Sequence, residues 1–367
     1  MLNRINAGPS STDDARRATG SPGPISEPRS FADSRDGDAD RRALIVIPAL
    51  NEAEGIATVL EQVLDDEDLA DPLVVVADGG STDGTREVVR EISRRNARVR
   101  LIDNPNRLQS AGVNRAVDAM AGDRPWLVRV DAHSEYPEHY ASSLIDEAVR
   151  TGATSVVVSV NTIGQTHFQR AVAAAQNSRL GTGGSLHRNA SSGQWVDHGH
   201  HGLCRLAAYR AVGGYDETFS HNEDAELDVR LGRQGARIWL TDRVRSNYYP
   251  RRTMKALAKQ YFNYGRGRAR TVLKHHTPLK MRQAAPLAVA PAVAGLALTP
   301  IFWAFALPAA AWSLAAIAGG AVLAVSRRDP VLLMSGPAAM TMHLGWSAGF
   351  WTELAARAHA RMRRPHA

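Results

Sequence analysis

The stretch LVRVDAHSEYP, Leu127 to Pro137, combines an apolar run with three side chains that can bind a metal ion. Asp131, His133 and Glu135 occupy alternate positions in it. Because side chains in an extended chain alternate between two faces, we expect these three to point the same way. Carboxylate oxygens bind Mg²⁺ and Mn²⁺, and Mn²⁺ accepts imidazole more readily. The stretch therefore predicts a metal-binding strand end, and the alternative is an ordinary strand followed by a polar turn.

The chain has 367 residues, 44% of them hydrophobic, which is enough to build a sizeable core. Its formal net charge of +7 is compatible with anionic lipids, phosphate-bearing ligands or nucleic acid as partners. The single cysteine, Cys204, excludes an intrachain disulfide and any cysteine-based zinc or iron–sulfur site. It also fits a reducing compartment.

Residues 1–40 are rich in Ser, Pro, Gly, Asp and Arg and show almost no apolar periodicity. Such a segment cannot bury enough apolar surface to offset the entropy of ordering, so we predict a disordered tail. The tail lacks the continuous apolar core of a secretion signal, and we therefore expect the domain that follows it to stay in the cytoplasm.

Short apolar strands alternate with amphipathic helices after this tail. The run ALIVI, Ala43 to Ile47, is stopped by Pro48, and a helix is predicted from about Glu54 to Leu64. The stretch LVVVADGGSTDGT, Leu73 to Thr85, begins a second unit of the same kind. This alternation predicts an α/β fold with a mostly parallel central sheet and flanking helices.

Polar residues follow these strands at the edge where α/β sheets bind ligands. Asn51 and Glu52 follow the first strand, Asp78 ends the second, and Asp131 ends a later one. The carboxyl ends of parallel strands meet at one edge, and the glycines after Asp78 let the backbone approach a nucleotide closely. An ordinary connection into a well-capped helix is the alternative. Three residues of the turn are candidate caps: Ser81, Thr82 and Asp83.

Two further polar groups have no diagnostic spacing. Arg107 and Asn114 lie near the start of a predicted helix, whose positive end favours phosphate, so pyrophosphate recognition and a solvated helix face both stay open. A later loop gathers Asp197, His198, His200 and His201. No ligand interval in this loop identifies a zinc site. We favour a loop that lines an acceptor or donor-sugar pocket over a purely structural loop.

Four motifs together resemble those of the inverting family-2 glycosyltransferases with the GT-A fold. They are VIPALNEAEGI, VVVADGGSTDGT, VRVDAHSEYP and GGYDETFSHNEDAELDVRL, in order and spacing over about Ala43 to Arg245. The likeness is greatest to bacterial exopolysaccharide β-glucosyltransferases of the succinoglycan-pathway type. The resemblance implies a GT-A nucleotide-sugar-binding domain over residues 41–250.

The resemblance also implies roles for the strand-end residues. Asp78 matches the acidic residue that contacts the uracil or ribose of the donor, and the segment Pro48 to Glu52, which includes Asn51, matches the loop around the base. Asp131 and His133 match the two ends of an Asp-any-Asp motif that binds the donor through Mg²⁺ or Mn²⁺, although a second Asp is more usual than His. Glu135 could supply a further ligand.

Asp224 matches the catalytic base that accepts the proton of the acceptor hydroxyl. An inverting transfer is one in-line displacement, which needs a carboxylate beside the nucleophile and a cation at the departing diphosphate. Glu223 is the rival for the role of base, and an acidic first helical turn without catalytic function is the alternative for the pair. We expect Glu226 and Asp228, one turn further on, to be surface charges.

The last third of the chain has the composition of a membrane-bound segment. Residues 251–283 mix Lys and Arg with apolar side chains, which predicts an amphipathic helix on an anionic membrane surface and leaves nucleic-acid binding as the alternative. Residues 284–352 predict two transmembrane helices turning near Ala306 to Pro308, with Pro330 to Trp351 as a third. A basic tail, residues 353–367, follows. Two spans keep this tail in the cytoplasm and three place it outside, against the positive-inside tendency.

These observations predict an inner (plasma) membrane glycosyltransferase with several spans and a cytoplasmic catalytic domain. We expect it to move a hexose, with glucose preferred, from a UDP-sugar to a polyprenyl-diphosphate-linked glycan in exopolysaccharide or cell-envelope synthesis. Membrane lipids are expected partners and nucleic acid is not. Two alternatives stay open, which are transfer to polyprenyl phosphate itself and a catalytically silent nucleotide-sugar-binding partner in a polysaccharide assembly complex.

Overall fold

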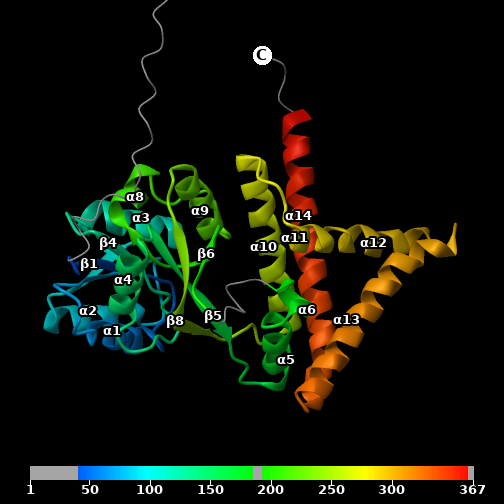
Figure 1. The fold of residues 1–367 in the computed structure, drawn as a ribbon, viewed down its shortest axis with the longest axis horizontal. Coiled ribbons are helices and arrows are strands. Elements are labelled where there is room, and N and C mark those ends of the chain that lie inside the picture. The colour runs from blue at the N-terminus through cyan, green and yellow to red at the C-terminus, as the bar shows by residue number, and fades with distance from the viewer. Residues whose placement is uncertain (1–39, 185–191, 363–367) are drawn as a thin grey trace, which may run out of the picture.

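The computed structural model describes residues 40–184 and 192–362 (Figure 1). All but the last residue of the predicted disordered tail lies outside this part of the chain, as do residues 363–367 of the predicted basic tail. The predicted domain boundaries stay predictions.

A mixed sheet with the strand order β3-β2-β1-β4-β7-β5-β8-β6 forms the centre of the N-terminal two thirds of the chain. Strands β1 to β5 and β8 form its parallel pairs, namely β1 with β2 and β4, β2 with β3, and β5 with β8. Strand β7 lies antiparallel between β4 and β5, and β6 pairs antiparallel with β8. The strands are Ala43–Ala49 (β1), Leu73–Asp78 (β2), Val99–Asp103 (β3), Trp126–Arg129 (β4), Ser155–Thr162 (β5), Gln194–Val196 (β6), His200–Arg205 (β7) and Ile238–Tyr248 (β8). The predicted α/β architecture is confirmed.

Helices cover both faces of this sheet, which explains why β1 is apolar at every position. Ala43, Ile45 and Ile47 point to one face, against α1 (Ile56–Leu64) and α4 (Tyr140–Thr151). Leu44 and Val46 point to the other, against α3 (Gln109–Met120), α8 (Leu206–Ala211) and α9 (Glu223–Arg233). A strand with two buried faces gains from apolar side chains at both of its alternating positions. Helix α2 (Thr85–Arg95) connects β2 to β3.

The remaining helices form a second layer beside the sheet domain (Figure 1). Helix α10 (Met254–His275) lies between that domain and the long helix α14 (Ser335–Met362), while α12 (Val289–Gly295) and α13 (Leu307–Ser326) extend away from both. Short elements join them: α5 (His167–Gln176), α6 (Arg179–Thr182), α11 (Met281–Leu287), η3 (Leu296–Leu298), η4 (Trp303–Ala306) and η5 (Pro330–Met334).

Helix α10 forms over the predicted basic segment, and its glycines are the contact points with its neighbours. A Cβ added to Gly265 would lie 1.9 Å from the carbonyl oxygen of Trp346 in α14, and one added to Gly267 would lie 2.5 Å from that of His221. Leu257 and Tyr261 are buried against α14 and α5. Helix α10 therefore packs against α14 and α5 on one side and against the loop before α9 on the other.

Two apolar helical stretches are long enough to cross a membrane by length and composition. They are Met281–Leu298 and Trp303–Ser326, and protein buries only 6% and 22% of their most apolar windows. The turn between them lies at residues 299–302, so the predicted turn near Ala306 to Pro308 is wrong. Pro308 instead occupies the first turn of α13, where a proline costs no hydrogen bond. The third predicted stretch, Pro330 to Trp351, falls in η5 and α14 and is not among the candidate spans of the described residues.

Candidate functional site

A cavity of about 1010 Å³ extends from the carboxyl ends of the strands to the C-terminal helices. Its strand end is lined by Pro48 and by polar residues that include Glu52, Arg107, Asp131, His133 and Asp224. Its helical end is lined by Tyr261, Val289, Trp312, Met342 and Trp346. Residues of the sheet domain and of the predicted membrane segment thus share one cavity.

Arg129 forms ion pairs with three carboxylates at the strand end of the cavity. Its guanidinium donates to Asp224 Oδ1 at 2.5 Å and to Asp131 Oδ1 at 3.3 Å, and it lies 3.7 Å from Glu223 Oε1. The hydroxyl of Tyr215 also donates to Asp224 Oδ1, at 2.8 Å. Arg129 ends β4, while the two carboxylates at 223 and 224 begin α9, so the ion pairs fix the start of that helix against the sheet.

His200 connects the same two aspartates from the other side. Its Nε2 lies 3.4 Å from Asp131 Oδ2 and its Nδ1 lies 3.6 Å from Asp224 Oδ2. Burial alone would lower the pKa of His200, but the two carboxylates outweigh burial and raise that pKa to about 9. At neutral pH the site therefore carries two cations, an arginine and an imidazolium, that face three carboxylates.

The cations act differently on the two adjacent acids of α9. Burial would raise the pKa of Asp224, but Arg129 and His200 hold it well below its usual range. The pKa of Glu223 is raised by burial and by the neighbouring Asp224. Asp224 is thus ionised at every physiological pH, whereas Glu223 gains its proton more readily. The pKa of Asp131 is lowered in the same way as that of Asp224, against the effect of burial.

Asp131, His133 and Glu135 do not lie on one extended strand as predicted, because β4 ends at Arg129. Asp131 and His133 line the cavity, and His133 Nδ1 lies 3.2 Å from Glu52 Oε1. Glu135 is not among the lining residues; its carboxylate accepts a hydrogen bond from the Tyr249 hydroxyl at 2.8 Å. The hydrogen bond with Glu52 raises the pKa of His133, more than burial lowers it.

The predicted donor loop packs against the turn after Asp78. Asn51 has a left-handed backbone with φ of 58°, and its Oδ1 accepts from the backbone N–H of Thr82 at 2.9 Å. Ser81 Oγ accepts from the N–H of Asn51 in return. Pro48 and Glu52 line the cavity, whereas Asn51 does not. Ser81, Thr82 and Asp83 therefore tie two loops together. The N-cap of α2 is Gly84, so Ser81 and Thr82 are not caps, whereas Asp83 Oδ1 accepts from the backbone N–H of Thr85, the first residue of the helix.

Asp78 is fully buried beneath this loop and does not line the cavity. Its carboxylate accepts from the backbone N–H groups of Gly80 and Ser81 at 3.1 and 3.0 Å and from Arg86 at 3.0 Å. Burial would raise the pKa of Asp78, but these hydrogen bonds lower it. In this arrangement Asp78 shapes the turn at the strand ends, beside β1, whose Ala49 is its register partner.

Glu226 and Asp228 are fully buried, so their prediction as surface charges is wrong. Asp228 Oδ1 lies 2.7 Å from His201 Nε2, and its other oxygen accepts from the backbone N–H of Gly199. Asp228 thereby supports the loop that carries His198 and His200, both of which line the cavity. Glu226 faces α10 on another side of α9. The helix buries these acids because it is covered by β7 and by α10.

Arg107 and Asn114, which were predicted together as possible pyrophosphate contacts, lie in different surroundings. Arg107 lines the cavity, but Asn114 does not. The Asn114 side chain accepts from the backbone N–H of Tyr215 at 2.9 Å and donates to its carbonyl oxygen at 2.9 Å. Gly213 and Gly214 precede this tyrosine with φ of 77° and 69°, a conformation that favours glycine. Asn114 thus holds the turn that leads into α9.

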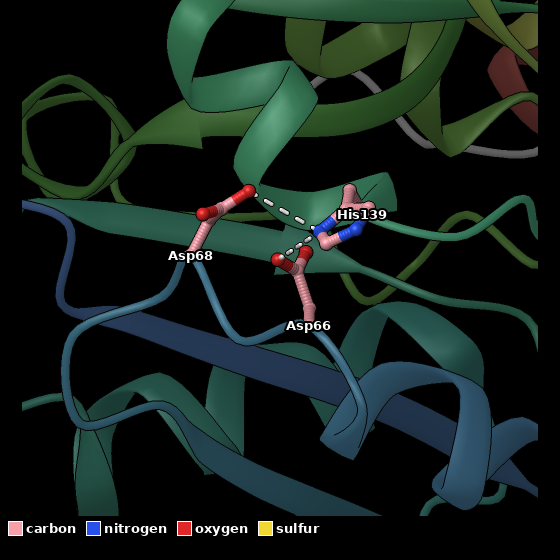
Figure 2. Close-up of side chains that lie close together, drawn as sticks. All are labelled: Asp66, Asp68 and His139. Atoms are coloured by element: carbon pink, nitrogen blue, oxygen red, sulfur yellow. Dashed lines mark ion pairs between the residues drawn. The ribbon is translucent and has the colours of Figure 1, made fainter.

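A group of potential metal ligands lies away from the cavity, between the loop after α1 and the start of α4 (Figure 2). His139 Nδ1 lies 3.2 Å from Asp68 Oδ2 and 3.6 Å from Asp66 Oδ1. Among the described residues this is the one group of three such side chains whose ligand atoms lie within 4.8 Å of one another. Asp66 also accepts from the backbone N–H of Ser142, so it ties this loop to the first turn of α4.

Arg129 is a residue of the site that belongs to none of the four sequence motifs as a predicted functional residue. A signal was present, since an arginine stands between Val128 and Val130 in a strand that is otherwise apolar. A charge is rarely buried without a partner, so this position predicts buried carboxylates nearby. Its partners begin a helix about a hundred positions later, and the sequence pattern does not reveal that pairing.

Comparisons with known proteins agree with this geometry. The family model described as "Glycosyl transferase family 2" matches residues 44–212. Succinoglycan biosynthesis protein ExoA of Rhizobium meliloti (strain 1021) is 50% identical over 321 residues, which cover 88% of this chain and 97% of that protein. A second relative is the dolichyl N-acetyl-alpha-D-glucosaminyl phosphate 3-beta-D-2,3-diacetamido-2,3-dideoxy-beta-D-glucuronosyltransferase of Methanococcus voltae. It is 23% identical over 245 residues, which cover 63% of this chain and 74% of that protein.

A solved structure shares the fold. The mannosyltransferase PcManGT from Pyrobaculum calidifontis, solved in complex with GDP-Man and Mn²⁺, superposes with a TM-score of 0.58 at 19% identity. The likeness covers 87% of this chain and 88% of that one, so it includes the sheet and the helices beside it. The predicted GT-A architecture is confirmed. The match over nearly the whole of a relative at 50% identity shows that the chain belongs to glycosyl transferase family 2 and is an enzyme of that family.

Proposed function

We propose that this glycosyltransferase moves a hexose, with glucose the first choice, from a UDP-sugar to a polyprenyl-diphosphate-linked glycan. The name of its 50% identical relative, a succinoglycan biosynthesis protein, supports a place in exopolysaccharide synthesis. Transfer proceeds with inversion to a β-linkage in this proposal. The observation that carries it is the single cavity shared by Asp131, Asp224 and the apolar C-terminal helices.

The residues at the strand end fit a bound divalent cation. Asp131 presents a carboxylate to the cavity, and Mg²⁺ is commonly held by one or two carboxylates together with substrate phosphates. Asp131 with His133 would hold Mg²⁺ or Mn²⁺, whereas Glu135 is occupied by Tyr249 outside the lining. When bound, the ion neutralises charge on the departing diphosphate. His133 could ligate through a deprotonated Nε2 while its Nδ1 stays hydrogen-bonded to Glu52.

The chain itself supplies the remaining parts of the site. The Pro48 to Glu52 loop, supported from beneath by Asp78, encloses the nucleoside. Asp224 accepts the proton of the acceptor hydroxyl, and its low pKa means that the carboxylate is already ionised at neutral pH. That low pKa also makes it a weak base, so Arg129 and His200 must move toward the donor phosphates for Asp224 to gain basicity. Both cations lie within reach of the carboxylates and of the cavity.

The variant Asp224→Asn tests the base. General base catalysis contributes about 10²- to 10⁴-fold, so we expect transfer to fall by that factor while UDP binding is retained. Glu223→Gln is the matched control, because it removes the adjacent carboxylate and keeps the same helix start. Near-wild-type turnover by Asp224→Asn would remove Asp224 from this role, and a loss confined to Glu223→Gln would assign the base to Glu223.

The pH profile separates the two carboxylates as well. A base must be deprotonated, so the rate falls as the pH drops below the pKa of the base. Because the pKa of Asp224 is depressed and that of Glu223 is raised in the free enzyme, a kcat/KM that stays flat at mildly acidic pH supports Asp224. A kcat/KM that declines as the pH falls through the mildly acidic range supports Glu223, whose pKa is raised.

Transfer to polyprenyl phosphate itself is a second candidate function. The name of the Methanococcus voltae relative describes transfer to a sugar on a dolichyl phosphate, which supports a lipid-linked acceptor of either kind. An acceptor assay with polyprenyl phosphate and with polyprenyl-diphosphate-linked glycan separates them. A catalytically silent nucleotide-sugar-binding partner is the remaining alternative, and slow hydrolysis of UDP-sugars by purified protein would exclude it.

The proposal also places the protein in the inner (plasma) membrane, with a cytoplasmic catalytic domain. The two apolar stretches Met281–Leu298 and Trp303–Ser326 support it, because protein covers so little of their surface. Release of the chain from membranes by salt alone, without detergent, would contradict this localisation.

A further inference from the structure

Three arginines from separate elements line the cavity. Arg179 belongs to α6, Arg268 to α10 and Arg282 to α11. His198, which precedes β7, lies beside them, with its Nε2 3.4 Å from Arg268 Nη2. The same cavity is lined by the carboxylates of the strand end and by the apolar residues of the helical end. We call these three arginines the arginine cluster.

No arginine of the cluster forms an ion pair within 4.0 Å with a carboxylate of the described part of the chain, although Asp197 acts on Arg282 from further away. Other arginines of the same region do: Arg266 and Arg270 of α10 pair with Glu353. Lys280, beside the cluster, forms an ion pair with Asp197. Charged side chains that line a cavity without a counter-ion are costly unless a ligand of opposite charge completes them.

The titration of neighbouring groups reflects this excess of positive charge. Burial and the nearby Arg282 lower the pKa of Arg268 to about 10. Burial and the surrounding cations Arg268, Lys280 and Arg282 lower the pKa of His198 to about 4. The imidazole is thus neutral at physiological pH, and its ring can accept a hydrogen bond from Arg268. The cations repel one another, so an anion bound between them would relieve the repulsion.

The apolar surface begins where the arginine cluster ends. Arg282 is the second residue of the apolar stretch Met281–Leu298. Leu180, next to Arg179, packs against α13, because a Cβ added to Gly319 would lie 2.7 Å from the Leu180 side chain. Beyond the cluster the cavity is lined by Val289, Trp312 and Trp346. A ligand that spans this part of the cavity needs an anionic group followed by a hydrocarbon chain.

We propose that the arginine cluster holds the phosphate groups of a prenyl-lipid acceptor, with the lipid chain leaving along the apolar walls formed by α11 to α14. This assignment rests on the proposed function, because it places the acceptor of the same site. Arginine is suited to the task because its planar fork binds phosphate oxygens in pairs. Such a lipid carries sugar, phosphate and hydrocarbon in that order, and the cavity is lined by groups suited to each, namely Asp224, the arginine cluster and apolar residues of α11 to α14.

The position of α10 brings this site close to the catalytic carboxylates. Gly267, the residue before Arg268, packs against the backbone of His221, and Asn222 donates to Thr271 of α10 at 2.8 Å. Glu223 and Asp224 follow directly. Lipid phosphates and the acceptor hydroxyl are therefore held by two helices in direct contact. The donor diphosphate belongs instead to Asp131, at the ends of the strands.

The test is the variant Arg268→Gln/Arg282→Gln of the full chain in detergent micelles, with binding measured by calorimetry. The probes are farnesyl diphosphate, farnesyl phosphate and UDP with Mn²⁺. Loss of charge-assisted hydrogen bonds from each arginine should weaken binding of the better prenyl ligand at least 10- to 100-fold. UDP affinity should stay within about twofold, which also reports that the sheet domain is folded.

Lys255→Gln is the matched control, since it removes a positive charge from the exposed face of the same helix outside the cavity. Arg268→Lys keeps the charge but not the fork, and we expect an intermediate loss. Tighter binding of the diphosphate than of the monophosphate would identify a diphosphate-linked acceptor, and the reverse order would identify polyprenyl phosphate; either order supports the site.

Unchanged prenyl-ligand affinity in the double variant would overturn the inference, as would an equal loss of UDP affinity, which would assign the arginine cluster to the donor. Hydrolysis of UDP-glucose by the wild type needs no acceptor and tests the proposed function separately. A wild type that hydrolyses UDP-glucose, together with unchanged prenyl binding in the double variant, refutes only the phosphate site.

Discussion

Replacement of Glu226 by glutamine would remove one negative charge from the junction between α10 and α9, the helix that carries the proposed base Asp224. The Glu226 side chain is fully buried. It accepts from Arg230 Nη2 at 2.6 Å, from Lys274 Nζ at 2.6 Å and from His275 Nε2 at 2.9 Å. Glutamine has nearly the same shape, so the change isolates the loss of charge and leaves three donors around a weaker acceptor.

The size of the effect follows from burial. Removal of one partner from a buried ion pair costs about 3–5 kcal/mol. Because the Lys274 side chain is 36% exposed and can turn to water, we take the lower end, about 3 kcal/mol. At about 2 °C per kcal/mol for a chain of this size, the unfolding midpoint should fall by roughly 6 °C. The matched control is Glu91→Gln, which pairs with Arg94 and Arg95 on the surface and should cost less than about 0.5 kcal/mol.

The pH dependence gives a second check. Burial would raise the pKa of Glu226, but Arg230, Lys274 and His275 lower it. A depressed carboxyl pKa stabilises the fold above the pKa of the unfolded state, about 4.3, and this contribution is lost as the pH falls through the folded pKa. The difference in unfolding midpoint between wild type and Glu226→Gln, measured by differential scanning fluorimetry in detergent, should therefore shrink below about pH 4. A midpoint no lower than that of Glu91→Gln at pH 7 would refute the reasoning.

Two further predictions concern helix packing and the metal. Gly265→Ala places a methyl group 1.9 Å from the Trp346 carbonyl oxygen, so α10 and α14 must separate and the unfolding midpoint should fall. The control is Gly232→Ala, because Gly232 has open space around it and an alanine there should leave the midpoint unchanged or raise it. Equal midpoints for the two variants would contradict the close packing of these helices. Chelation of divalent ions by EDTA should abolish sugar transfer, and added Mn²⁺ or Mg²⁺ should restore it in the wild type but not in Asp131→Asn. Full activity in EDTA would remove the metal from the proposal.

Local sequence patterns predicted the sheet because the apolar residues of each strand or helix indicate which of its faces are buried. The unbroken apolar run of β1 indicated a strand covered on both faces, and Ile56, Val59, Leu60 and Val63 of α1 indicated one buried helix face. The strand-end positions of Asp78 and Asp131 followed from the same pattern. Identification of a single shared edge needed only the rule that parallel strands end together.

The environment of each acid was less predictable, because it depends on contacts between distant segments. Asp131 continued the pattern of an exposed strand end, yet the chain turns after Arg129 and sends Glu135 to Tyr249. Glu226 looked like a surface charge until α10 was placed on it. The periodicity of apolar residues predicts which side of a helix is buried. A buried charged residue does not belong to that apolar pattern, so its burial is seen only when its partners are known.

The sequence by itself therefore determined the family, the alternation of strands and helices in the sheet domain, and Asp131 and Asp224 as candidate acids of the site. Only the tertiary structure decided that Arg129 and His200 join those acids, and that arginines from α6, α10 and α11 meet in the same cavity. The physical reason is distance along the chain. A motif is encoded by neighbours that occur together, whereas an ion pair or a binding cluster between remote segments depends on how the whole chain packs.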